Sequence, residues 1–299
     1  MDVGHYRKVI KDCFPQIDID SARPIVEGWD SFVLEVNGEL IFRFPRRSQV
    51  AVQLAKEIEL LPRLGEHLSV PIPRFDFICK DPGAVARFVG YPKIQGVPLN
   101  ELSPDLALSE SMARQLARFL SELHSFPVAT ALQAGLPDNT PSSWWAEYRD
   151  LYARIEAEVL PLLSPRAQYN LCSLWEAVLS RTAVGFGPTL VHRDLGSEHI
   201  ICDRTHGSLT GIIDWGDAEI GDPAIDFVGL LHSYGREFVE RVLASYQGAL
   251  GATFWERALF YTRIIPIYGA LYGPEIDDKD HLKQSIIDLE AEFAEPSAR

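Results

Sequence analysis

Two stretches decide the fold of this chain: Leu190-Val191-His192-Arg193-Asp194-Leu195-Gly196-Ser197-Glu198-His199-Ile200-Ile201 and Gly211-Ile212-Ile213-Asp214-Trp215-Gly216-Asp217. In each stretch an apolar run, which is typical of a short buried strand, leads into an aspartate. Strands fix the loops that follow them, and loop carboxylates can bind Mg²⁺ and an attacking hydroxyl. The pair therefore predicts a metal–phosphate site, although either aspartate alone could simply cap a turn.

The spacing in the first stretch matches the catalytic loop of protein kinases. That loop reads H-x-D-x-x-x-x-N and is followed by D-F-G. Here His192 and Asp194 are followed by His199 in place of Asn, and Asp214 opens the second motif. Both histidines stand in register with both aspartates, which favours a kinase-like site over two independent turns.

Composition and charge limit the class of protein. The 299 residues are 46% hydrophobic, enough for two lobes, and no apolar stretch approaches the ~20 residues of a membrane span. Residues 1–95 carry 13 basic and 13 acidic side chains, so the whole net charge of −14 falls on residues 96–299, with 15 and 29. We expect no nucleic-acid polymer or membrane as partner; the acidic part either attracts a cationic small molecule or is simply solvated.

The cysteines and the N-terminus indicate a cytoplasmic protein. Residues 1–8 lack the apolar core of a signal peptide. Cys13, Cys79, Cys172 and Cys202 are far apart and form no CxxC pair. We expect four reduced, buried thiols without a disulfide, in a monomeric chain.

The N-terminal part alternates like a sheet. We expect a helix at 3–14, strands at 23–26, 32–36 and 39–44, a helix at 49–64, and strands at 75–79 and 85–88. Asn37-Gly38 predicts a hairpin turn because both residues tolerate positive φ. Leu40, Phe42 and Phe44 share one face of the return strand, and Ile41 and Arg43 share the other.

Arg43 on an apolar face needs an anionic partner. A nucleotide phosphate would serve, and so would a surface carboxylate. Glu57, in the middle of the next helix, could orient this cation or could face solvent. The turn at 27–31, which ends at Ser31, holds one glycine and is only a weak phosphate-loop motif.

Residues 88–96 read as a strand that runs into an extended hinge, whose backbone edge would face a nucleobase. The expected lobes are residues 1–92 and 99–299, joined by a hinge at 93–98. Beyond it we expect helices at 104–124, 144–160, 166–181, 236–248, 253–271 and 279–294, with a loop at 128–143. His124 is interpreted as structural, and Asp222 and Asp226 as carboxylates that bond backbone N–H groups and brace the active loop.

These residues resemble the aminoglycoside phosphotransferase family, the small-molecule branch of the kinase fold. Its signatures are matched by Val191-His192-Arg193-Asp194 with His199, by Ile212-Ile213-Asp214-Trp215-Gly216-Asp217, and by Gly221-Asp222-Pro223 with Asp226-Phe227. Residues 42–46, 90–99 and 116–124 are most similar to the 2''-acting aminoglycoside enzymes. The resemblance implies a two-lobed, protein-kinase-like α+β fold, with a β-rich N-terminal lobe and a mostly helical C-terminal lobe.

The resemblance also implies roles for individual residues. Asp194 would accept the proton of the substrate hydroxyl or orient it, and His199 and Asp214 would hold Mg²⁺. The implied nucleotide site contains Arg43, Glu57, Ser31, Tyr91, Lys93 and Ile94. Arg43 stands where the family generally has lysine, and bulky Tyr91, at the purine gate, favours GTP over ATP.

The acceptor is less well defined, because the acidic run of the 2''-type enzymes is replaced here by residues 229–234. Candidate groups for a cationic acceptor are Glu198, Glu237, Tyr268 and Glu275, with Asp277 and Asp278. We expect Mg²⁺-dependent phosphoryl transfer from GTP or ATP to an aminoglycoside. Two alternatives are a macrolide or metabolic-alcohol kinase, whose pocket would use Trp255, Tyr261, Tyr268 and Tyr272, and an inactive nucleotide-binding module in which Arg43 and His199 are lesions.

Overall fold

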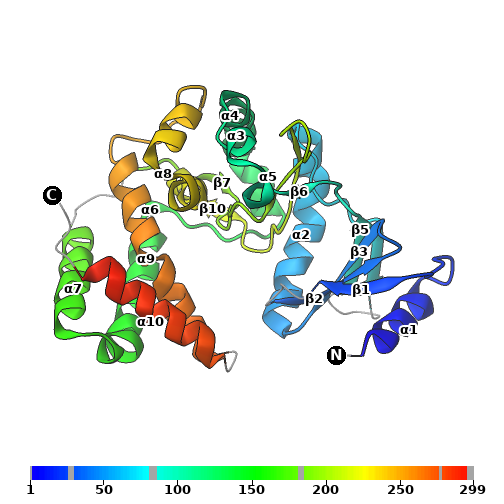
Figure 1. The fold of residues 1–299 in the computed structure, drawn as a ribbon, viewed down its shortest axis with the longest axis horizontal. Coiled ribbons are helices and arrows are strands. Elements are labelled where there is room, and N and C mark those ends of the chain that lie inside the picture. Colours follow the sequence, from blue (N-terminus) through cyan, green and yellow to red (C-terminus); the bar gives the residue numbers. More distant parts are fainter. Residues whose placement is uncertain (1, 26–29, 81–85, 181–184, 276–277, 295–299) are drawn as a thin grey trace.

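The computed structural model describes residues 2–25, 30–80, 86–180, 185–275 and 278–294. Figure 1 shows an N-terminal lobe on the right, built on a sheet, and a larger helical part on the left. The two-lobed α+β fold is therefore confirmed, whereas the boundaries at 92 and 99 stay predictions. Among the described residues, no helix combines the length and the apolar character that a membrane span requires.

The N-terminal lobe is a five-stranded antiparallel sheet with a helix on each face. The strand order is β1-β2-β3-β5-β4, and the elements are α1 (Val3–Cys13), β1 (Ala22–Ile25), β2 (Ser31–Val36), β3 (Leu40–Pro45), α2 (Ser48–His67), β4 (Phe77–Lys80) and β5 (Ala86–Pro92). Helix α1 covers the face that carries Phe42 and Phe44, and Leu54 of α2 packs against Val89 on the opposite face.

The hairpin between β2 and β3 forms as its sequence predicts. Val36 pairs with Leu40, and the intervening turn places Asn37 at φ 56° and Gly38 at φ 72°. The alternation along β3 is also confirmed, because Phe42 joins the core under α1 while Arg43 points to the other side.

The C-terminal lobe surrounds two small sheets with helices. Its elements are β6 (Val97–Pro98), the 3₁₀ turn Leu99–Glu101, α3 (Pro104–Ala107), α4 (Glu110–His124), α5 (Val128–Gln133), α6 (Pro141–Arg154), the π turn Ile155–Val159, the 3₁₀ turn Leu160–Leu162, α7 (Pro165–Leu179), β7 (Thr189–Val191), β8 (Ile200–Cys202), β9 (Leu209–Ile212), β10 (Glu219–Gly221), the 3₁₀ turn Pro223–Phe227, α8 (Val228–Leu243), α9 (Phe254–Glu275) and α10 (Lys279–Phe293). One large core unites them, and it includes Leu60, Leu61 and Leu64 of α2. Helix α2 thus belongs to both lobes.

Two helix predictions need correction. The expected loop at 128–143 contains α5, which buries Ala131 and ends before Gly135 at φ 82°. The apolar helix expected after the turn of Asp222 and Asp226 and the helix expected from residue 236 are one element, α8, which begins at Val228. Gly235 (φ 77°, ψ 175°) interrupts its helical geometry, and this kink separates the two predicted patterns.

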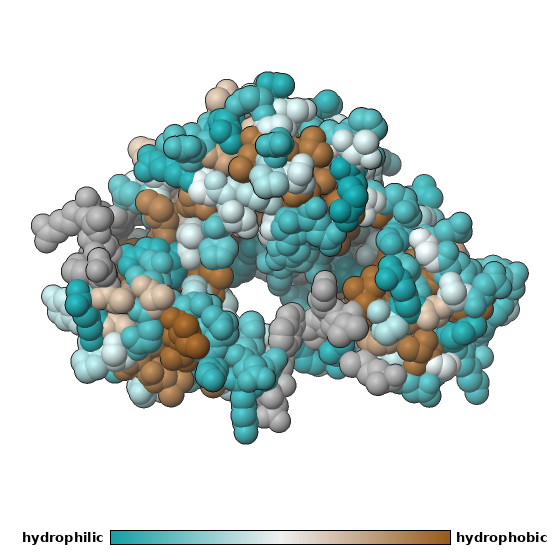
Figure 2. Space-filling model, in the orientation of Figure 1, coloured by the Kyte–Doolittle hydropathy of each residue, from teal (hydrophilic) through white to brown (hydrophobic). Residues whose placement is uncertain are grey.

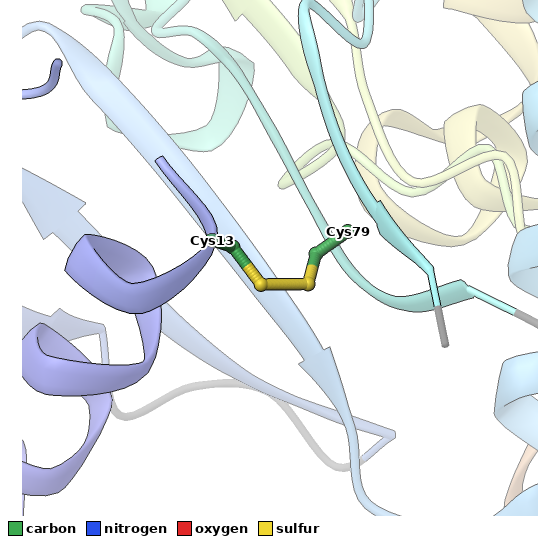
Figure 3. The surroundings of a disulfide bond; sticks show 2 residues. All are labelled: Cys13 and Cys79. Carbon is green, nitrogen blue, oxygen red and sulfur yellow. A yellow bond between two sulfur atoms is a disulfide. The ribbon is translucent and has the colours of Figure 1, made fainter. Parts of the chain in front are cut away.

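The prediction of four reduced cysteines is wrong. Cys13 at the end of α1 and Cys79 of β4 form a disulfide (Figure 3), while Cys172 and Cys202 are free. The two residues are 66 positions apart in sequence, and they meet only because α1 packs across the sheet. The spacing of cysteines along the chain carries no sign of that contact.

Gly90 is a position where the sheet leaves no room for a side chain. A Cβ atom there would lie 2.3 Å from Cε1 of Phe42, whose ring is fully buried. We predict that Gly90→Ala lowers the free energy of unfolding by about 1–3 kcal/mol through overpacking. Urea unfolding would measure this against Gly187→Ala, whose Cβ has open space. Equal midpoints for the two variants would contradict the packing of this sheet.

Candidate active site

Strand pairing brings the two aspartate loops together. The loop with Asp194 joins β7 to β8, and the loop with Asp214 joins β9 to β10. Because β7 pairs with β10 and β8 pairs with β9, the two loops leave the strands side by side. Ile213 N–H donates to the carbonyl of His199 at 3.0 Å and ties one loop to the other.

Both loops contain a non-glycine residue in the left-handed region, Arg193 at φ 69° and Asp214 at φ 65°. Such backbone persists only where neighbouring groups hold it. Asp226, which is fully buried, accepts the N–H of His192 at 3.0 Å and that of Arg193 at 2.8 Å. The bracing role predicted for Asp226 is confirmed.

His124 and Asp222 support this arrangement from behind. Nε2 of His124 lies 3.0 Å from Asp226, and its Nδ1 lies 2.7 Å from the hydroxyl of Tyr246, so the structural interpretation of His124 is confirmed. Asp222 accepts the N–H of Ala224 at 3.0 Å and pairs with Arg257 at 2.6 Å. It therefore braces the 3₁₀ turn after β10.

His199 lies between the two aspartates. Its Nδ1 donates to the carbonyl of Asp194 at 2.7 Å, and its Nε2 faces Oδ2 of Asp214 at 3.8 Å. Burial alone would lower the pKa of His199, but the carboxylates of Asp194 and Asp214 raise it above its usual value. Because Nδ1 is the donor, a neutral imidazole here presents the lone pair of Nε2 towards Asp214.

Asp194 sits at the surface of the cleft among other acids. Its side chain is 55% exposed, yet the surrounding protein raises its pKa to about 6, against the opposing effect of His199. The carboxylates of Asp217, Asp214 and Glu198 raise this pKa further. A carboxylate with a raised pKa is a better proton acceptor than an ordinary aspartate.

Arg43 connects the two lobes at this site. Its guanidinium donates to Glu57 of α2 at 2.8 Å and to Asp214 at 3.3 Å. The sequence left open whether Arg43 pairs with a nucleotide phosphate or with a carboxylate. In the structure its partners are two carboxylates, Glu57 and Asp214. Burial raises the pKa of Glu57 to about 7 despite Arg43. Burial also opposes the charge of Asp214, but Arg43 and His199 outweigh it and lower that pKa.

The other expected nucleotide residues lie on the sheet that carries Arg43 or directly after its strand β5. Buried Tyr91 pairs with Ile41 across the sheet, and burial raises its pKa to about 12. The side chain of Lys93 pairs with Glu35 of β2, whereas the backbone of Ile94 forms no hydrogen bond within the described residues. Ser31 begins β2 and is buried; of the turn before it, residues 27–29 lie outside the described residues.

The expected acceptor residues are only partly brought together. The carboxylate of Glu198 raises the pKa of Asp194, and Tyr268 is exposed on α9 close to Arg193. Glu275 pairs with Arg154 at 3.0 Å, and the side chain of Glu237 forms no hydrogen bond or ion pair within the described residues. Asp278 caps α10, and Asp277 lies outside the described residues.

Gly229, the first residue of the segment that replaces the acidic run of the 2''-type enzymes, lies against the loop that carries Asp194. A Cβ atom at this position would lie 2.2 Å from the carbonyl oxygen of Leu195. The first turn of α8 therefore packs directly on the loop that carries Asp194, and no side chain fits between them.

Four residues that make contacts at the site, Asp217, Arg193, Arg47 and Asp30, had no role predicted from the sequence, and Tyr272 was expected only in the macrolide alternative. Asp217 accepts a hydrogen bond from Gln53 of α2 at 3.0 Å, across the cleft. Arg47 and Asp30 of the N-terminal lobe contact the hydroxyl of Tyr272 on α9. Arg193 pairs with Glu147 and Glu219. Only Asp217 and Arg193 had a signal in the sequence, because they stand inside the two quoted stretches.

Comparison with known proteins agrees with this geometry. The model of the phosphotransferase enzyme family matches residues 21–261. The chain belongs to the phosphotransferase enzyme family. Members of this group are small-molecule kinases, which the loops of Asp194 and Asp214 and the two-lobed fold also indicate.

One relative in sequence and two solved structures are similar to this chain. Viomycin phosphotransferase of Streptomyces vinaceus is 32% identical over 65% of this chain and 66% of its own length, so the match spans just under two thirds of that relative. The aminoglycoside 2''-phosphotransferase of type IIIa, solved with GDP and kanamycin, is 34% identical to this chain, with a TM-score of 0.88. The match covers 97% of this chain and 98% of that protein. A macrolide 2'-phosphotransferase of Brachybacterium faecium shares the fold, with a TM-score of 0.76 at 22% identity. The match covers 99% of this chain and 100% of that protein.

His192 should make the stability of this phosphotransferase depend on pH. Its ring is fully buried, Nε2 donates to the carbonyl of Ile213 at 2.9 Å, and Nδ1 has no partner within the described residues. Burial lowers its pKa to about 4. Between pH 6.5 and 4 the unfolded chain binds a proton at this residue that the folded chain does not, so stability falls as the pH falls through this window.

The expected loss is about 3 kcal/mol for this one group. Urea unfolding at pH 7 and pH 4.5 would show a smaller loss in His192→Leu than in the natural protein. His206→Gln, at an exposed histidine, should retain the full loss. An identical pH dependence in His192→Leu and the natural protein would contradict a neutral His192 in the core.

Proposed function

We propose that this enzyme transfers the γ-phosphoryl group of GTP or ATP, with Mg²⁺, to a hydroxyl of a cationic small molecule, in the first place an aminoglycoside. The supporting observation is one continuous set of contacts across the cleft. It runs from Asp194 through His199 to Asp214, and from Asp214 to Arg43 on the other lobe. Proton acceptor, metal ligands and phosphate-binding cation would thus be held in one place before ligands arrive.

The reaction needs little covalent chemistry from the protein. The acceptor oxygen forms a bond to the γ-phosphorus as the bond to the β–γ bridging oxygen breaks, and the nucleoside diphosphate leaves. Asp194 accepts the hydroxyl proton or orients the hydroxyl, and Arg43, held by Glu57, neutralises phosphate charge. Positioning and charge neutralisation supply most of the rate.

The residues present fit a magnesium ion that is shared with the nucleotide. Mg²⁺ is usually held by one or two carboxylates together with substrate phosphates. Among the described residues no cluster of three or more ligands could hold a metal by itself. Asp214 and Nε2 of His199 would hold the ion, which would neutralise the charge of the phosphates.

The charge around Asp194 supports a cationic acceptor. Arg43, Arg47 and Arg193 are already paired with carboxylates of this protein. Within the described residues, Asp217 and Glu198 have no ion-pair partner. An ammonium group of the acceptor would find unpaired carboxylates beside the attacking hydroxyl. Kanamycin and viomycin, which appear in the names of relatives, are the first acceptors to test.

GTP is the donor that we propose first, because Tyr91, which is bulky and buried, stands at the position expected to gate the purine pocket. The backbone groups of Ile94, which form no hydrogen bond within the described residues, would bond the base edge. A relative was solved with GDP, which agrees with this choice.

The macrolide alternative has less support. Of the aromatic side chains that could line its pocket, Tyr261 is buried and donates to Asp222 at 2.7 Å. Tyr272 is engaged with Arg47. The contacts of Arg43 with Glu57 and of His199 with Asp194 speak against the inactive-module alternative, because they hold both side chains beside Asp214.

The decisive experiment is nucleotide turnover by the purified protein with Mg²⁺ and GTP or ATP, across a panel of aminoglycosides, viomycin and macrolides. We expect turnover that depends on a cationic acceptor and is faster with GTP. Turnover with macrolides alone would replace the acceptor class, and nucleotide binding without any transfer would establish the inactive module.

Asp194→Asn tests the proton acceptor. We predict a fall in kcat of about 10²–10⁴-fold, because the amide cannot take the hydroxyl proton. Nucleotide affinity by calorimetry should change less than about twofold, since Asp194 lies outside the Arg43 contacts. Asp18→Asn, at an exposed acid of the N-terminal lobe, is the matched control and should retain full activity. Full turnover in Asp194→Asn would exclude this mechanism.

A further inference from the structure

Arg193 is fixed at both ends, although it is neither a metal ligand nor a proton acceptor. Its N–H donates to Asp226 at 2.8 Å. Its guanidinium pairs with Glu219, the first residue of β10, and with Glu147 of α6. Asn139 joins these two acids, because its amide N–H donates to Glu147 and, at 3.3 Å, to Glu219.

The backbone of Arg193 needs such support. Its φ of 69° lies in the left-handed region, which costs a side-chain-bearing residue about 1–3 kcal/mol. Asp226 fixes the N–H groups of His192 and Arg193, and the carbonyl of Asp194 accepts from Gly196 N–H at 3.0 Å and from Nδ1 of His199 at 2.7 Å. None of these bonds holds the side chain of Arg193, and a rotation about its N–Cα bond would swing its Cβ and move Asp194 at the same time.

We propose that Arg193 is a positioning residue for phosphoryl transfer. Its ion pairs with Glu147 and Glu219 fix the direction of its side chain, and so fix φ and the place of Asp194 beside His199. This inference rests on the role proposed for Asp194. It adds a specific dependence of the catalytic carboxylate on two acids, one of which belongs to helix α6.

The geometry of the guanidinium decides which substitutions are informative. Lysine keeps the charge at one point and cannot donate as a fork to two carboxylates. Alanine would leave Glu219, which is 8% exposed, buried without its partner, and this could unfold the chain. The double variant Arg193→Met, Glu219→Gln removes both charges together and avoids that cost.

We expect kcat of the double variant to fall about 10–100-fold, because small displacements of a reacting group have effects of this order. KM for nucleotide and acceptor should stay within about twofold. Arg193→Lys should recover part of the loss. Arg118→Met, at an exposed ion pair on α4, should match the natural protein. Unchanged kcat in the double variant, or a change in KM alone, would overturn the inference.

A crystal structure of the double variant decides the point without activity. We expect the backbone at position 193 to leave φ near 69° and the bond from His199 Nδ1 to the carbonyl of Asp194 to be lost. Retention of both would overturn the inference. If the natural protein transfers phosphate to no acceptor, the proposed function fails, and this structure still decides the role of Arg193.

Discussion

The structure depends on one buried arginine shared between two carboxylates. Arg43 reaches Glu57 within its own lobe and Asp214 in the other lobe. Loss of one partner from a buried ion pair typically costs about 3–5 kcal/mol. Arg43, helix α2 and the loop of Asp214 therefore keep fixed positions relative to one another. An arginine can serve both carboxylates because its donors are arranged as a fork. Figure 2 shows the surface hollowed between the side of α2 and β2 and the side of α9 and α10.

In the C-terminal lobe, strained backbone fixes the loops of Asp194 and Asp214. The loops of Asp194 and Asp214 each contain a left-handed residue, and buried groups hold these residues in place. Asp226 binds the first loop from below, and His199 spans the space between the loops. Strain of this kind is a common feature of active sites, because it fixes functional groups without a flexible side chain between them.

Most of the fold and part of the site could be predicted from short local patterns in the sequence. The turn at Asn37, the two faces of β3 and the strand–aspartate motifs of Asp194 and Asp214 each follow from a few adjacent residues. Their roles in catalysis remain proposals, but their proximity could be predicted because motif spacing reflects a known loop geometry.

The features that escaped prediction are tertiary contacts. The Cys13–Cys79 disulfide, the burial of Tyr261 and the pairing of Arg193 with Glu147 each join segments far apart in sequence. No local periodicity encodes which side chains meet when helices pack on a sheet. The acceptor stays a proposal for the same reason, since its pocket is assembled from several distant segments.

The most direct test of this account is the affinity of Mg²⁺–GTP for Arg43→Met, measured by titration calorimetry against Arg46→Met, which removes the same charge from an exposed neighbour. We expect a Kd at least about tenfold higher for Arg43→Met and a change of less than about twofold for Arg46→Met, because a charge-assisted bond to phosphate is lost only in the first. Equal affinities for the two variants would contradict the central place given to Arg43.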